Sequence, residues 1–338
     1  MKRNANIVAT GHYVPERKIT NADMKEEFSK IGLGEVVDKL EKSTGILQRY
    51  YAPDDWAGSD LAVPACQMAM KRAGITPDQV DLIVLGTDSP DYITPATSTV
   101  VQHKIGAKNA GTFDVGCACS SFPAGVAIAS GLIQSNPNLN NVLVVSVYMM
   151  RKLTDPKDPS IFFYGDGAGA AVLQPGKKKG FLGTKMIADG QYAKAWGIFS
   201  GGTFEPASVE SVEAGRTTVK LVGEYPADIN TRNWPNLIRD LAKQGGFKLS
   251  DVDQIIFTQV NKHAIMQVLE ELGMDESKAH IIMEKWGYTG SACIPMALDD
   301  AVMAGKVKKG DLVMMVGSGV GYNMTATAYR INTELPKN

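Results

Sequence analysis

The segment DVGCACSSFPAGVAIASG, residues 114–131, contains a turn of small residues between an apolar run and a helix-like run. The apolar run, FDV at 113–115, predicts the end of a buried strand. Apolar side chains then recur at helical spacing: Phe122, Val126, Ala129 and Ile133. We therefore predict that a buried helix begins near Ser121.

The same order of pieces occurs a second time. Residues 80–133 and 252–305 each contain an apolar run (VDLIVLGT against VDQIIFTQ), a small-residue turn with cysteine, and a helix-like run with an early proline. Any chain of alternating strands and helices shows some self-similarity, but the matched prolines, Pro123 and Pro295, favour duplication. The sequence therefore predicts two similar α/β halves, 1–177 with Cys119 and 178–338.

Short apolar runs alternate with helix-period stretches along the chain. Strands are predicted at 81–87, 141–147, 169–173, 253–259, 311–317 and 326–331. Apolar strands separated by helices are typical of a mainly parallel sheet that helices cover on both faces. The predicted fold class is therefore α/β.

Composition excludes several classes of protein. With 338 residues, 44% of them hydrophobic, and a net charge of −1, the chain resembles a soluble globular protein without a nucleic-acid or membrane partner. Its four cysteines have neither the spacing of a zinc site nor the density of a disulfide framework. We expect reduced thiols, no bound metal and a cytoplasmic location.

Cys119 is the candidate nucleophile. A cysteine just before a helix faces unpaired N–H groups and the positive end of the helix dipole, which lower the pKa of a thiol. Small neighbours leave room for a substrate. Cys117, two residues earlier, is expected to point into packing. The alternative is that both cysteines are small buried hydrophobes, as free cysteines usually are.

Seven segments carry a resemblance to a known family over nearly the whole chain. They are GHYVPERKITNAD (11–23), TGI (44–46), PDYITPATS (90–98), DVGCACSSF (114–122), YGDGAGAAVL (164–173), QVN (259–261) and GSACIP (290–295). In this order and at this spacing, they resemble the β-ketoacyl-acyl-carrier-protein synthase III family of thiolase-fold condensing enzymes.

The resemblance implies a duplicated five-layer αβαβα thiolase fold, present as a homodimer or as a heterodimer with a related condensing enzyme. The loop at 90–98 then reaches toward the partner's active site. The family's nucleophile falls on Cys119, which takes an acyl group from a thioester of coenzyme A or of acyl carrier protein. No permanently bound cofactor is implied.

Two positions depart from the family's pattern. The family's His and Asn hold the carbonyl of a malonyl thioester while it loses CO₂ and stabilise the enolate. In this chain these places hold Thr258 and Tyr288. The glycine-rich loop at 317–323 is present, and Val320 falls where a backbone N–H is donated to the oxyanion.

Further candidates follow from position alone. His263, on the helix after QVN, and Asp91, on the loop at 90–98, are possible bases. Expected substrate contacts are Phe162, Phe163, Asn261 and Thr94. The other histidines are expected to be structural: His12 in a turn, His103 on a helix, and His280 at the start of a strand.

Three functions remain open. The first, which we favour, is an atypical C–C condensing acyltransferase that acts through acyl-Cys119. The second is acyl transfer to oxygen or nitrogen, or thioester hydrolysis, through the same acyl-cysteine, which needs no enolate stabilisation. The third is a non-catalytic partner subunit of an active condensing enzyme. The retained Cys119 argues against the third function, and the lost His and Asn argue for it.

Overall fold

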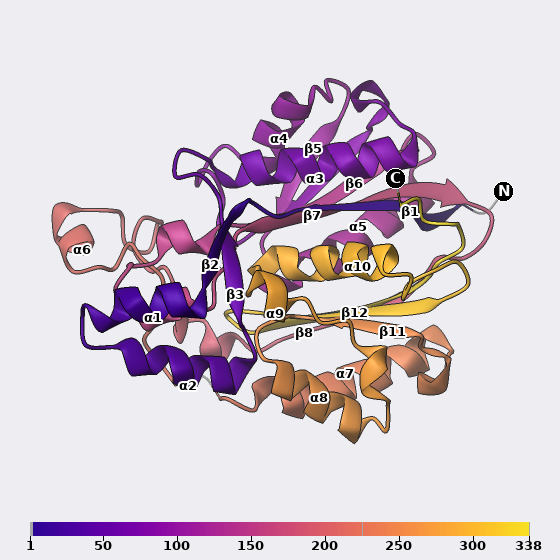
Figure 1. Ribbon diagram of the computed structural model, residues 1–338. Helices are drawn as coiled ribbons and strands as arrows, with labels where there is room; N and C mark the ends of the chain where they lie inside the picture. Colours follow the sequence, from indigo (N-terminus) through magenta and orange to yellow (C-terminus); the bar gives the residue numbers. More distant parts are fainter. Residues whose placement is uncertain (1–2, 225, 338) are drawn as a thin grey trace.

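The computed structural model describes residues 3–224 and 226–337, which form five stacked layers (Figure 1). Two β-sheets alternate with three layers of helices, and one of these layers lies between the sheets. This arrangement confirms the predicted α/β class and the five-layer αβαβα thiolase fold.

Each sheet combines strands that are distant in the sequence. The first sheet has the order β1 (Asn4–Tyr13), β7 (Gly167–Gly176), β6 (Val142–Tyr148), β4 (Leu82–Gly86) and β5 (Gly111–Val115). The second sheet has the order β11 (Gln254–Phe257), β12 (Leu312–Gly319), β13 (Asn323–Arg330) and β8 (Phe181–Ala188). Most of these strands are almost wholly buried because helices cover both faces of each sheet.

The helices form the other three layers. On the outer face of the first sheet lie α3 (Gly58–Ala73) and α4 (Thr97–Ile105), and on the outer face of the second lie α7 (Ile229–Gly245) and α8 (Lys262–Glu271). Between the sheets lie α5 (Ser121–Ser135) and α10 (Cys293–Met303). Both central helices carry a proline in their first turn, where its missing N–H leaves no helical hydrogen bond unmade.

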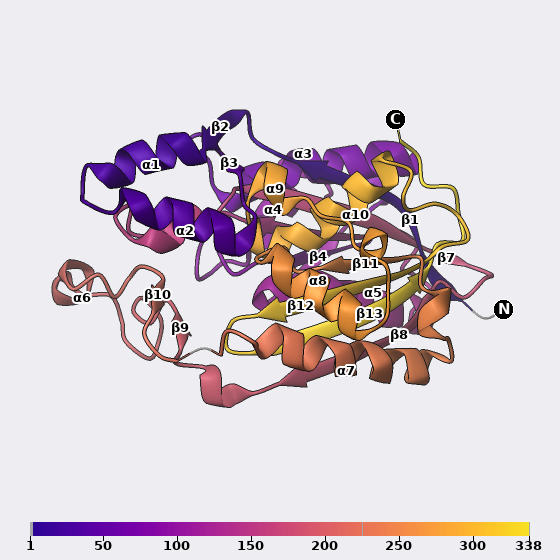
Figure 2. The same ribbon diagram turned by 60° about the horizontal axis from the view of Figure 1, so that its bottom comes forward.

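Smaller elements gather around one end of the layered body (Figures 1 and 2). They are α1 (Asn21–Ser29), α2 (Gly34–Thr44), the paired strands β2 (Arg17–Thr20) and β3 (Gln48–Tyr51), and α9 (Met283–Trp286). A segment with α6 (Val209–Glu213), β9 (Trp196–Gly197) and β10 (Lys220–Leu221) projects at the same end.

The expectation of mainly parallel sheets is wrong. Within the described chain, β4 pairs in parallel with β5 and β6, and β11 pairs in parallel with β12. The other four neighbouring pairs of the two main sheets are antiparallel. Only three residues, 320–322, join β12 to β13, which is too short for a helical crossover. Burial on both faces gives parallel and antiparallel strands the same apolar pattern, so the sequence did not distinguish them.

The two sheets share one pattern of neighbours. The order β4, β6, β7, β1 in the first sheet corresponds to β11, β12, β13, β8 in the second, with the same sequence of strand directions. The chain passes from one sheet to the other between β7 and β8. This agreement supports the duplication, while the boundary between 177 and 178 stays a prediction.

Two histidines lie in other elements than we expected. His12 lies within β1, not in a turn, and its Nδ1 is 2.6 Å from Oδ2 of the buried Asp299. His280 does not open a strand, because the segment after it forms the short helix α9. Its Nε2 is 2.6 Å from Oδ2 of Asp300. Both histidines are thus hydrogen-bonded to a carboxylate within the fold. His103 lies on α4, as predicted.

Candidate active site

Cys119 lies in a 3₁₀ turn, Ala118–Ser120, directly before α5. Ala118 has φ +46°, a left-handed conformation that side chains rarely adopt and that costs roughly 1–2 kcal/mol. Strand β12 holds this turn closely. A Cβ atom added at Gly317 would lie 2.9 Å from the carbonyl oxygen of Cys119. A Cβ atom added at Gly319 would overlap the carbonyl oxygen of Cys117. Glycines in β12 therefore let the strand pack against the turn that carries Cys119.

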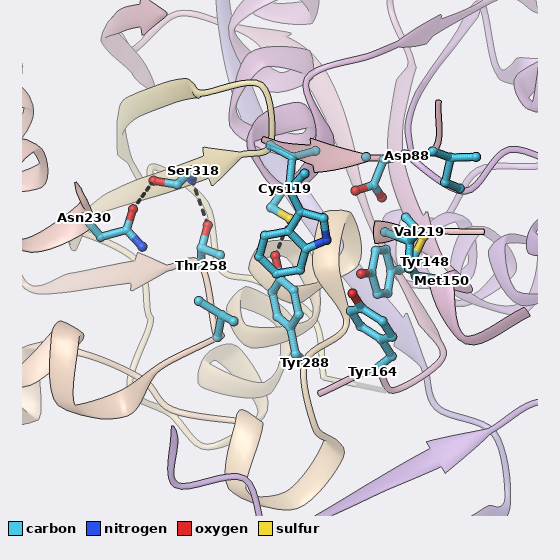
Figure 3. Close-up of a pocket in the computed structure, with 15 residues that line it drawn as sticks. Asp88, Cys119, Tyr148, Met150, Tyr164, Val219, Asn230, Thr258, Tyr288 and Ser318 are labelled. Atoms are coloured by element: carbon cyan, nitrogen blue, oxygen red, sulfur yellow. Dashed lines mark hydrogen bonds between the residues drawn. The ribbon is translucent and has the colours of Figure 1, made fainter. Parts of the chain in front are cut away.

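Tyr288 is hydrogen-bonded through its hydroxyl to Sγ of Cys119 (Figure 3). Its backbone N–H donates to the carbonyl oxygen of Phe163 at 2.8 Å, and its carbonyl accepts from Gly165 N at 2.9 Å. These two hydrogen bonds fix the backbone of Tyr288 beside the segment 163–165. The ring also packs 5.8 Å from that of Tyr148. Tyr288 therefore contacts the candidate nucleophile directly.

A cavity of about 270 Å³ opens onto the sulfur of Cys119. Its lining residues are Asp88, Cys119, Tyr148, Met150, Tyr164, Trp196, Gly197, Ile198, Val219, Asn230, Thr258, Val260, Tyr288, Ser318 and Val320. The cavity therefore combines apolar and aromatic walls with a few polar groups, as small-molecule sites usually do.

Thr258 lies on the cavity wall at the end of β11 and belongs to a hydrogen-bonded chain. Its Oγ1 accepts from the backbone N–H of Ser318 at 3.0 Å. The Ser318 hydroxyl donates to Oδ1 of Asn230 at 2.7 Å and accepts from the indole N–H of Trp234 at 2.7 Å. Because Oγ1 of Thr258 is the acceptor in its bond, its O–H can point a donor into the cavity.

Asp88 lines the same cavity two residues after the end of β4. The Ser291 hydroxyl lies 3.4 Å from Oδ1 of Asp88 but 2.7 Å from the carbonyl oxygen of Val147. A hydroxyl has one proton, so the shorter bond to Val147 receives it, and the Asp88 carboxylate keeps a hydrogen bond from its own backbone N–H. Burial raises the pKa of Asp88 to about 6.

Burial also governs the thiol and the tyrosines. It raises the pKa of the Cys119 thiol well above its ordinary value, and the charge of Asp88 adds to this rise. The hydrogen bond with Tyr288 acts in the opposite direction. Burial likewise raises the pKa of Tyr288 and of Tyr148. The expectation of a lowered Cys119 pKa is therefore wrong, because desolvation of the buried sulfur outweighs the effect of the helix start.

The structure brings together four predicted site residues and places two others in packing. Cys119, Thr258, Tyr288 and Val320 all line the cavity. Phe162 and Phe163 do not line it: Phe162 is fully buried, and the guanidinium of Arg49 lies 4.7 Å from its ring centre.

The remaining predicted residues lie outside this cavity. Asn261 caps α8, accepting from Ala264 N at 3.1 Å, and the exposed His263 bonds the carbonyl oxygen of Lys42 at 3.2 Å. Asp91 accepts from Ser59 N at 2.9 Å near the start of α3. Thr94 is exposed on the loop 90–98.

Asp88 and Asn230 were not predicted as site residues. A signal existed for Asp88, because it is the first charged residue after a strand with parallel neighbours on both sides, where α/β sites form. Asn230 is in the first turn of α7, beyond an irregular segment, and no motif marks it. In the described part of the chain, no group of three or more His, Cys, Asp or Glu could hold a metal, and no helix could span a membrane.

Comparisons with known proteins agree on one family. Residues 113–190 match the family model 3-oxoacyl-[acyl-carrier-protein] synthase III, and residues 241–331 match the model of its C-terminal part. The chain is 33% identical over 331 residues to β-ketoacyl-[acyl-carrier-protein] synthase III of Clostridioides difficile, covering 98% of this chain and 99% of that protein.

Solved structures show the same similarity. The 3-oxoacyl-[acyl-carrier-protein] synthase III of Aquifex aeolicus has a TM-score of 0.84 at 29% identity, covering 96% of this chain and 99% of its own. The corresponding protein of Pseudomonas aeruginosa has a TM-score of 0.87 at 25% identity, covering 99% of this chain and 100% of its own.

Proposed function

The chain belongs to the 3-oxoacyl-[acyl-carrier-protein] synthase III family of acyltransferases, and on this premise we propose that it acts through an acyl-Cys119 intermediate. The observation that carries the proposal is the position of Cys119. Its sulfur faces a cavity at the start of a central helix and is hydrogen-bonded to Tyr288.

In the first step, the Cys119 sulfur attacks the carbonyl carbon of an acyl thioester. A new C–S bond forms, the bond to the donor's sulfur breaks, and the cysteine's proton ends on the departing thiol. The Tyr288 hydroxyl stabilises negative charge on the Cys119 sulfur by donating a hydrogen bond. The backbone N–H of Val320 is our candidate donor to the carbonyl oxygen.

The second step differs from that implied by the family's pattern. Thr258 and Tyr288 supply hydroxyl donors, but neither can accept a proton as a base near neutral pH. We therefore propose condensation with a carbon nucleophile that needs no decarboxylation assisted by His and Asn. The second candidate function is acyl transfer to oxygen, to nitrogen or to water. The absence of the His and Asn favours it too, because this transfer requires no enolate.

We further propose that two copies, or one copy and a related condensing enzyme, associate through the loop 90–98. Tyr92 and Ile93 on this loop are 59% and 80% exposed, which is unusual for large apolar side chains. All four cysteines are free, which is typical of a reducing compartment, so we propose that the protein acts in the cytoplasm.

The test is a set of turnover assays with acyl-coenzyme A and acyl-carrier-protein donors of increasing chain length. Each donor is offered with water alone, an alcohol, an amine or a carbon acid, and the products are identified by mass. We expect donor consumption that depends on Cys119 and a carbon–carbon product. Ester or amide products would favour the second candidate. A protein that consumes no donor would contradict the proposal and favour a non-catalytic partner subunit.

A further inference from the structure

Asp88 is the only acidic side chain among the described residues that line the Cys119 cavity. No lysine, arginine or histidine accompanies it in that lining. In Figure 3, Cys119 and Tyr288 lie between Thr258 on one side and Asp88 on the other. The cavity therefore presents one carboxylate, opposed by no cation, on the side of the nucleophile away from Thr258.

The contacts of this carboxylate leave it able to accept a proton. The Asp88 carboxylate accepts from its own backbone N–H, and the Ser291 hydroxyl, 3.4 Å away, bonds Val147 more closely, so the carboxylate keeps free acceptor capacity. A partly buried carboxylate with weak support is suited to exchange a proton with a substrate. Asp91, only three residues later, is different, because its Oδ1 is engaged by Ser59 N outside the cavity.

We propose that Asp88 is the general base of the second half-reaction and that the acceptor is an uncharged 3-oxoacyl thioester. This inference rests on the acyl-Cys119 intermediate proposed above. Asp88 takes a proton from C2 of the acceptor, and C2 forms a bond to the acyl carbon. The bond from that carbon to Cys119 breaks, and the proton on Asp88 returns to the cysteine sulfur.

The chemistry of the cavity selects this class of acceptor. A carboxylate base is weak, and the family's enolate-stabilising pair is absent, so the carbon acid must itself be acidic. A C2 proton between two carbonyl groups meets this need, whereas one beside a single thioester carbonyl does not. A malonyl thioester carries its own carboxylate, which the charge of Asp88 repels when no cation lines the cavity.

The titration of Asp88 suits this role. Its pKa of about 6 leaves it largely deprotonated at neutral pH, while it remains basic enough to accept a proton in the transition state. The titratable groups that face it are Cys119, Tyr148, Tyr164 and Cys293, whose pKa values burial and the Asp88 charge raise together. Because these groups are neutral near pH 6, the transfer rate should rise with pH through about 6 as Asp88 loses its proton.

The test separates the two half-reactions. The protein is first acylated with acyl-coenzyme A, and the adduct is measured by intact mass. The acetoacetyl thioester of N-acetylcysteamine is then added as an uncharged acceptor, with malonyl-coenzyme A as the charged comparison. Asp88→Asn is the test variant. Asp81→Asn is the matched control, because Asp81 lies before the start of β4, outside the cavity, and an asparagine oxygen can still accept from Asn140 N and Asn141 N.

We expect Asp88→Asn to form the adduct at least as fast as the wild type, because losing the negative charge lowers the pKa of the Cys119 thiol. Its transfer to the acetoacetyl thioester should fall by about 100-fold or more, with loss of the rise through pH 6. Asp81→Asn should transfer like the wild type, and malonyl-coenzyme A should not discharge the adduct.

Three outcomes overturn the inference: transfer by Asp88→Asn at the wild-type rate, a wild-type adduct that resists the acetoacetyl thioester, and discharge of the adduct by malonyl-coenzyme A with release of CO₂. In each of these cases the acyl adduct itself still stands. A wild-type protein that forms no adduct with any donor contradicts the proposed function, and the inference falls with it.

Discussion

Replacing Tyr288 with phenylalanine should slow the reaction of Cys119 with electrophiles. The Tyr288 hydroxyl is hydrogen-bonded to the Cys119 sulfur and lowers the pKa of the thiol. A hydrogen bond to a charged group contributes about 1.5–3 kcal/mol and one between neutral groups about 0.5–1.5 kcal/mol. In Tyr288→Phe the thiolate therefore loses about 1–1.5 kcal/mol more stabilisation than the thiol does. This difference raises the pKa of the Cys119 thiol by about one unit, at 1.36 kcal/mol per unit.

Alkylation by iodoacetamide measures this loss. At a pH below the pKa of the thiol, one pKa unit reduces the thiolate fraction about tenfold, so the rate of Cys119 alkylation should fall by about that factor in Tyr288→Phe. Intact mass follows the rate in a Cys117→Ala background, which removes the half-buried neighbour. Tyr148→Phe is the control, because its hydroxyl is not bonded to the sulfur. Equal or faster alkylation in Tyr288→Phe would refute the reasoning.

The remaining predictions concern the turn and the lost pair. Gly319→Ala should lower the free energy of unfolding by about 2 kcal/mol or more and abolish acylation, because the added Cβ overlaps the backbone of the turn before Cys119. Gly131→Ala on α5 is the control, because its added Cβ meets nothing within 4 Å. This variant should raise the free energy of unfolding by about 0.5–1 kcal/mol. Thermal and urea unfolding measure both, and equal effects would contradict the close packing of β12. Thr258→His with Tyr288→Asn should release CO₂ from malonyl-coenzyme A only when Asp88→Asn also removes the repelling charge. Release without that third change would contradict the electrostatic argument.

The repeated order of pieces predicted the α/β class and the two similar halves, whereas the five-layer arrangement was implied by the family resemblance. Both central helices begin with a small-residue turn and an early proline, and both were placed from that pattern. Strand direction was not predictable from the same signal, since burial on both faces hides it. The short loop at 320–322 was the available clue to an antiparallel return.

The site was predictable only in part. Cys119, Thr258 and Tyr288 line one cavity, and their positions followed from motifs. The pKa of Cys119 did not follow, because it depends on how deeply tertiary packing buries the sulfur. In the structure, Asp88 faces the cavity, whereas Asp91 is hydrogen-bonded to Ser59 of α3. The sequence did not distinguish them, because the direction of a side chain in a loop follows no periodic pattern.

The most direct measurement of the central claim is rapid-quench intact mass after mixing the protein with acetyl-coenzyme A. The account predicts one added acetyl group in the wild type and in Cys117→Ala, and none in Cys119→Ala. Peptide mapping should place the group within residues 114–131. An acetyl group that persists in Cys119→Ala, or a wild type that remains unmodified with every acyl donor, would contradict the account.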